Sequence, residues 1–119
     1  MTTNKTTLSR AHSITLMLFE LGIPAHRMGY RQLQMAIPMY ILDDTQSLTK
    51  HIYPSIAAHW GHSNGCAVEH SIRLAIQDAW QERDPETWAQ YVPNAQKVPS
   101  NKLFIATLAE RLKQHDFSI

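Results

Sequence analysis

Residues 53–80, YPSIAAHWGHSNGCAVEHSIRLAIQDAW, contain two helical patterns separated by a short polar turn. Pro54 suits the first position of a helix, where a missing N–H costs nothing. Residues 61–65, GHSNG, place two glycines beside cap-forming side chains and should end that helix. Apolar residues at helical spacing then mark the buried side of a second helix, namely Val68, Ile72, Ala75, Ile76 and Ala79. A short helix, a glycine-containing turn and a helix buried on one side are typical of the helix-turn-helix unit.

The opposite side of the second predicted helix is left for a partner. It carries Ala67, His70, Ser71, Arg73, Leu74 and Gln77. In helix-turn-helix proteins this side normally enters the major groove of DNA. Two packed helices of an all-α domain that binds no DNA would show the same apolar spacing, so the pattern alone leaves both interpretations open.

The composition limits which classes of protein fit. A chain of 119 residues, with 44% hydrophobic and 18% charged residues, is apolar enough for one domain with its own core, which excludes disorder. Its 11 basic and 10 acidic residues give a net charge of +1, so any nucleic-acid contact needs positive charge gathered on one face. One cysteine, Cys66, excludes an internal disulfide framework. With no signal core and no run of about 20 apolar residues, we expect a cytoplasmic protein without a membrane segment.

The rest of the chain predicts helices and no strand, because no segment alternates apolar and polar residues. The predicted fold is all-α, with about six helices and a helix-turn-helix unit that lacks a wing. Residues 1–9 are polar and rich in threonine, which predicts a flexible N-terminal linker. The domain would then occupy residues 10–119, with Ser9 as the cap of its first helix.

Turn and cap residues divide the remaining predicted helices. Pro38 lies inside the pattern of the helix over residues 30–41 and predicts a kink or an early end near Ile37. Three cap-forming residues predict later helix starts, namely Ser47, Asp84 and Ser100.

A cluster of side chains around the turn could hold a zinc ion, namely His59, His62, Cys66 and His70. Their spacing matches no zinc motif, and polar turn residues with a partly buried thiol give the same pattern. We therefore expect no metal and no cofactor. The chain has no G-x-S-x-G motif and no glycine-rich phosphate loop, so we do not expect an enzyme.

Several segments together resemble one known family, the C-terminal DNA-binding (effector) domain of the stage-zero sporulation protein A response regulator. The matching segments are ELGIPAH (20–26), Gly29-Tyr30, Leu33, Ala36-Ile37, LTKHIYPSIA (48–57), VEHSIRLAIQDAW (68–80) and PSNKLFIATLAERLK (99–113). The resemblance implies an all-helical domain that binds double-stranded promoter boxes and activates or represses transcription. It also implies head-to-tail pairs on DNA, a phosphorylated receiver domain preceding the effector, and contact with the sigma subunit of RNA polymerase.

The resemblance implies a set of site residues. The recognition helix would begin near Cys66, and the DNA contacts before and along it would be Ser63, Asn64, Cys66, Ala67, Glu69, His70 and Arg73. Phosphate contacts would come from Lys50, Asn101 and Lys102. Glu69 can accept a hydrogen bond from cytosine and Arg73 can reach guanine or phosphate, unless Arg73 pairs internally with Glu69 or Asp78. The polymerase contact would fall on Gln81, Glu82, Arg83, Asp84 and Glu86, a segment that also reads as an ordinary solvated helix junction.

Three positions depart from the family pattern. Ala67 and His70 stand where the family has arginines, and Leu74 stands where it has a histidine. Because an arginine bound to guanine through two hydrogen bonds contributes about 1–3 kcal/mol of discrimination, these changes predict altered reading of DNA. A rival hypothesis is a protein-interaction module of the same fold that modulates another regulator.

Overall fold

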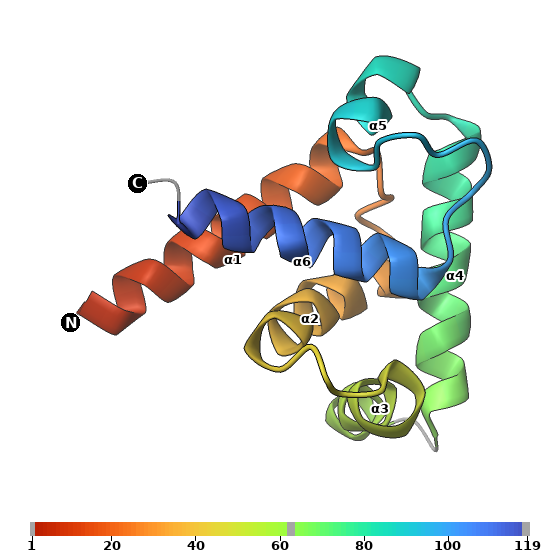
Figure 1. Ribbon diagram of the computed structural model, residues 1–119. Helices are drawn as coiled ribbons and strands as arrows, with labels where there is room; N and C mark the ends of the chain where they lie inside the picture. The colour runs from red at the N-terminus through yellow and green to blue at the C-terminus, as the bar shows by residue number, and fades with distance from the viewer. Residues whose placement is uncertain (1, 62–63, 118–119) are drawn as a thin grey trace.

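The structure is a computed structural model that describes residues 2–61 and 64–117, with side chains described for 9–61 and 64–114. Within these residues the chain is entirely helical, which confirms the predicted all-α class (Figure 1). Its elements are α1 (Thr2–Glu20), α2 (Met28–Leu42), the π-helical turn η1 (Leu48–Ile52), α3 (Tyr53–Trp60), α4 (Gly65–Gln81), α5 (Pro85–Tyr91) and α6 (Asn101–Phe117).

The second helix forms the centre of the molecule. It packs against α1, α3, α4, α6 and η1. Figure 1 shows α4 standing along one side, with α2 and α6 running toward it and α3 near its first turn. Leu33, Ala36 and Ile37 of α2 are fully buried, so this helix joins the N-terminal part of the core to the helix-turn-helix unit.

The predicted apolar stripes lie in the core. All five stripe residues of α4 are buried, as are Ile14, Met17 and Leu18 of α1 and Leu21 just after it. The last helix buries Phe104, Ile105, Leu108, Ala109 and Leu112. Each stripe is wide enough to cover one side of its helix and leaves the other side to solvent.

Three of the predicted caps are confirmed by hydrogen bonds. The side chains of Ser47 and Ser100 accept from the backbone N–H of the residue three positions later, each at 3.1 Å. Asp84 accepts from the N–H of Thr87 at 3.3 Å and from its hydroxyl at 2.6 Å. These bonds satisfy N–H groups that have no partner inside a helix, which fixes where each helix begins.

Of the two outcomes predicted at Pro38, a kink or an early end near Ile37, the early end is wrong. α2 continues through this residue to Leu42, although proline cannot donate to the carbonyl one turn earlier. The turn before Pro38 contains Leu33, Ala36 and Ile37, which have no exposed surface. Burial of these side chains against the surrounding helices offsets the cost of the missing hydrogen bond.

The first helix begins earlier than Arg10. α1 starts at Thr2, and Ser9 lies within it rather than at its cap. No glycine or proline occurs between residues 2 and 20 to stop the helix, and adding a turn to an existing helix costs less than starting one. In Figure 1 this end of α1 extends away from the other helices. A linker role for residues 1–9 stays a prediction.

A glycine in the left-handed conformation ends each of two helices. Gly22 ends α1 in a left-handed conformation, with φ of 81°, and Gly61 ends α3 with φ of 74°. No helix in the described part of the chain is long and apolar enough to cross a membrane.

Candidate nucleic-acid interface

A close contact fixes the angle between the two helices of the helix-turn-helix unit. Gly65 is the first residue of α4, although the sequence placed it in the turn. A Cβ atom on Gly65 would lie 2.9 Å from Cβ of Tyr53 and 3.2 Å from the nitrogen of Pro54. Any larger residue would therefore push the start of α4 away from the start of α3. The side chain of Asn64 caps α4 by accepting from the N–H of Cys66 at 2.9 Å.

One side of α4 is open to solvent. Cys66, Ala67, His70 and Arg73 are exposed, and Glu69 is half-buried. We call these five residues the reading face. The structure therefore brings together the predicted contact residues that lie on this helix. Asn64 is exposed at its start, and Ser63 lies outside the described residues.

The charged groups of the reading face contact one another. Nε of Arg73 lies 3.2 Å from Oε1 of Glu69, and an Nη2 atom of Arg73 lies 2.9 Å from Nδ1 of His70. The side chains of Arg73 and Glu69 are 47% and 41% exposed, so this ion pair is on the surface. Pairs of this kind contribute only about 0.2–1 kcal/mol. Arg73 can therefore exchange Glu69 for a DNA partner at little cost.

The second acidic residue of α4 is also beside an arginine. Asp78 contacts Nε of Arg27, which precedes α2. Arg73 consequently pairs with Glu69, one of the two acids considered for it, and not with Asp78. Both carboxylates of α4 have a positive partner, so the helix presents no uncompensated negative charge toward DNA.

Asn101 is the first residue of α6, and its side chain faces the inside of the protein. Its side chain is only 9% exposed, and its Nδ2 atom donates to the hydroxyl of Tyr53 at 3.2 Å and to the carbonyl of Glu69 at 3.0 Å. Burial raises the pKa of the Tyr53 phenol above its ordinary 10.0, the bond from Asn101 opposes this, and the Glu69 charge adds to it. The Tyr53 hydroxyl therefore stays protonated at neutral pH. The amide nitrogen of Asn101 thus has two acceptors inside the protein, and a phosphate contact by this side chain stays a prediction.

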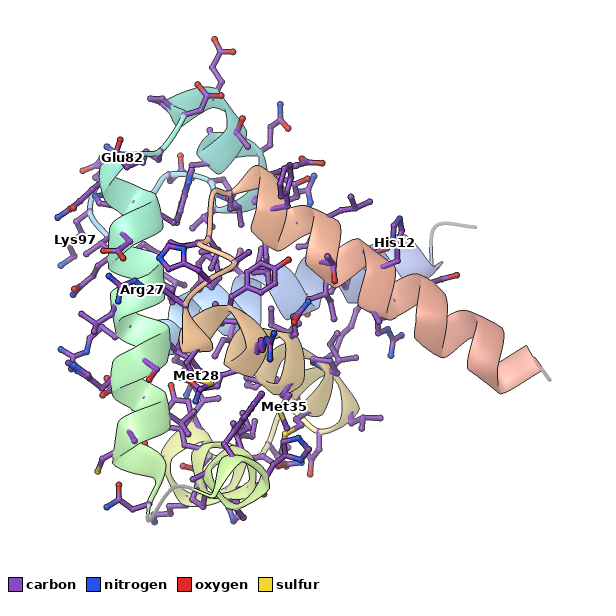
Figure 2. The ribbon with its side chains drawn as sticks, turned by 180° about the vertical axis from the view of Figure 1, so that it is seen from behind. His12, Arg27, Met28, Met35, Glu82 and Lys97 are labelled. Carbon is purple, nitrogen blue, oxygen red and sulfur yellow. The ribbon has the colours of Figure 1, made fainter. Side chains whose placement is uncertain are left out.

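Lysines flank the reading face. A hollow of about 890 Å³ lies beside α4, and its lining includes Glu69, Arg73 and Gln77 on one side and Lys97 and Lys102 on the other. Both lysines are exposed, as is Lys50 on η1. Figure 2 shows Lys97 beside α4. Sequence reasoning missed Lys97, because only the path of the loop before α6 brings it near α4.

The predicted polymerase-contact segment lies at the far end of α4, where Figure 2 labels Glu82. All five of its residues are exposed. The guanidinium of Arg83 lies 3.7 Å from the ring centre of Trp80, and the carboxylate of Asp84 caps α5. Trp80 in turn meets Trp88 edge-on, with ring centres 5.4 Å apart. Arg83 and Asp84 thus have structural roles at this junction as well as exposed surface.

The histidines near the turn have other neighbours. The ring of His59 packs edge-on against Trp60, with centres 5.4 Å apart, and His70 meets Arg73. Cys66 is an exposed thiol. Among the described residues, no three or more His, Cys, Asp or Glu side chains are grouped so that they could hold a metal ion. His62 lies outside these residues.

These observations define an all-α domain built around a helix-turn-helix unit, with one side of its second helix exposed and two lysines lining the hollow beside it. Residues 14–112 match the family described as Sporulation initiation factor Spo0A C terminal. Because this match covers most of the chain, the chain belongs to that family, which confirms the resemblance. It is a DNA-binding, transcription-regulating domain of the sporulation response-regulator type, in a family of regulatory domains rather than enzymes.

Proposed function

We propose that this domain reads promoter DNA sequence-specifically, with α4 in the major groove and the reading face toward the bases. The observation that carries the proposal is the exposure of this face, on which Arg73 contacts the surface partners Glu69 and His70. Lys97 and Lys102 line the hollow beside the helix, and Lys50 is exposed on η1, so that these three lysines can contact phosphates. Phosphate contacts set the register of a protein on DNA, while groove contacts supply sequence information.

The chemistry of the reading face suggests which contacts it makes. The Arg73 guanidinium can donate two hydrogen bonds to guanine, and the Glu69 carboxylate can accept from the amino group of cytosine. Ala67 offers a methyl group, which suits contact with the methyl group of thymine. With alanine and histidine at two positions where the family has arginines, the bound sequence should differ from the usual family box. The thiol of Cys66 and the amide of Asn64 lie at the start of α4, where backbone N–H groups favour a phosphate.

Two protein contacts complete the proposal. The exposed residues at the end of α4 and the start of α5 would contact the sigma subunit of RNA polymerase, and these are Gln81, Glu82, Arg83, Asp84 and Glu86. Two copies would bind adjacent boxes head to tail. We expect the protein to act in the cytoplasm, where it has access to promoter DNA.

Replacement of Arg73 by alanine tests the role of the reading face. Arg73→Ala should weaken binding to a preferred duplex by about 1–3 kcal/mol, because it removes a bidentate contact. The thermal midpoint of unfolding should stay nearly unchanged, since the lost ion pair is exposed. Fluorescence anisotropy with labelled duplex measures the first quantity and circular dichroism the second.

Arg111→Ala is the matched control. Arg111 lies on α6, where its guanidinium rests 4.9 Å from the ring centre of Tyr91 and donates to the carbonyl of Gln90. The Arg111→Ala variant also removes one positive charge, so comparison with Arg73→Ala separates the effect of lost charge from the effect of a lost base contact. Unfolding of the Arg73→Ala protein would show that Arg73 is a structural residue.

Salt-insensitive binding to a protein, with no binding to any duplex, would favour the rival interaction module, because phosphate neutralisation makes DNA binding fall steeply with salt.

A further inference from the structure

A side chain from α6 connects both helices of the helix-turn-helix unit. Asn101 is buried, and its amide nitrogen reaches the Tyr53 hydroxyl and the Glu69 carbonyl at 3.2 and 3.0 Å. An amide NH₂ group carries two hydrogens, so both bonds can form at once. Tyr53 is the first residue of α3, and Glu69 lies in the second turn of α4.

The Glu69 carbonyl belongs to the turn of α4 that carries the reading face. His70 follows it directly, and Arg73 is one turn further along. The bond from Asn101 reaches this turn beside Arg73, since Asn101, Glu69 and Arg73 all line the hollow next to α4. It therefore restrains rotation of α4 about its own axis at the residues that would meet the bases.

Small rotations of this helix would matter for reading. A side chain that extends about 7 Å from the helix axis moves by roughly 1 Å for each 10° of rotation, and binding groups need to be held within about 0.5 Å and 10–20°. Contacts with phosphates tolerate such a shift better, because lysine side chains are long and flexible.

We propose that Asn101 is a positioning residue for sequence reading: it holds the segment of α4 from Glu69 to Arg73 at the rotation that base contact requires. This inference rests on the proposed function of α4. The inference gives different roles to two neighbouring residues at the start of α6: Asn101 positions α4, whereas Lys102 is exposed and would contact only phosphates.

The specificity ratio, which is the dissociation constant for a scrambled duplex divided by that for a preferred duplex, tests the inference. One duplex is the sequence that the intact chain selects from a random library, and the other is a scrambled sequence of the same composition. Asn101→Ala should reduce this ratio about tenfold, with the affinity for the scrambled duplex and the salt dependence unchanged. Lys102→Ala, the matched control, should weaken binding to both duplexes equally and lower the salt slope by about 0.9.

Two further variants keep the test decisive. Tyr53→Phe removes one acceptor but leaves the bond to Glu69, so it should preserve the ratio. If the alanine variant does not fold, Asn101→Ser replaces it, because serine is too short to reach the Glu69 carbonyl. Equal loss on both duplexes, or an unchanged ratio, would overturn the positioning role. A wild-type ratio near one would instead refute the proposed function itself.

Discussion

Two glycines allow α4 to approach its neighbours at backbone distance. Gly65 brings the start of α4 against Tyr53, and Gly29 brings the start of α2 against the middle of α4. A Cβ atom on Gly29 would lie 2.3 Å from the carbonyl oxygen of Ser71 and 2.8 Å from Cβ of Ala75. Neither neighbour is the end of a flexible side chain, so the helices themselves would have to separate.

Gly29→Ala should lower the free energy of unfolding by about 1–3 kcal/mol, the usual cost of overpacking a core. Gly22→Ala provides a comparison, because no atom lies within 4 Å of its added Cβ and only its left-handed φ of 81° opposes the change. That variant should lose about 1 kcal/mol. Urea unfolding followed by circular dichroism measures both. A Gly29→Ala protein as stable as the wild type would contradict the packing described for α2 and α4.

The helix α2 continues past a proline in its interior. Pro38 cannot donate to the carbonyl of Gln34, and burial of the preceding turn compensates. The stability of α2 therefore comes from tertiary contacts more than from its own hydrogen bonds.

Pro38→Ala should raise the free energy of unfolding by about 1–3 kcal/mol, since alanine supplies the missing donor and has the best helix propensity. Pro24→Ala, in the loop between α1 and α2, should give no such gain, because a proline outside a helix mainly restricts the unfolded chain. Chemical denaturation compares the two proteins. A loss of stability in Pro38→Ala would mean that the proline ring contributes more through packing than its missing N–H costs.

The predictable elements were those determined by local patterns. The stripe from Val68 to Ala79 and the cap at Asp84 depend on residues three or four positions apart, so the sequence contains the whole signal. Asn101 is different, since its partners Tyr53 and Glu69 are 48 and 32 residues away. From the sequence, a polar residue at the start of a helix is expected to be exposed, because its distant partners are not known until the fold is known. Lys97 could not be found from the sequence for the same reason, because only the fold brings it near α4.

The core of the molecule begins at Ile14, the first buried residue among the described side chains. The family match begins at the same residue. The part of α1 before this point extends away from the other helices (Figure 1). We therefore expect the folded domain to need residue 10 onward, as the sequence predicts.

Removal of residues 1–9 should leave the thermal midpoint of unfolding within about 2 °C of the wild-type value, because the core would remain intact. Removal of residues 1–17 should destabilise the protein strongly, since it deletes the buried Ile14 and Met17. Differential scanning calorimetry compares the two truncations. A large loss of stability from the shorter truncation would show that these first residues belong to the domain.

The charge of the whole molecule makes its DNA binding dependent on local arrangement. A net charge of +1 gives little general attraction to DNA, so binding should depend on the lysines around α4. Sequence preference should then come from Glu69, His70 and Arg73, which can contact the bases.

Selection of bound sequences from a random duplex library measures whether these residues read bases. We expect enrichment of one box, with Arg73→Ala relaxing the preference at a guanine position within it. No enriched sequence, or an enriched box that Arg73→Ala reads as well as the wild-type protein does, would contradict base reading by this face of α4.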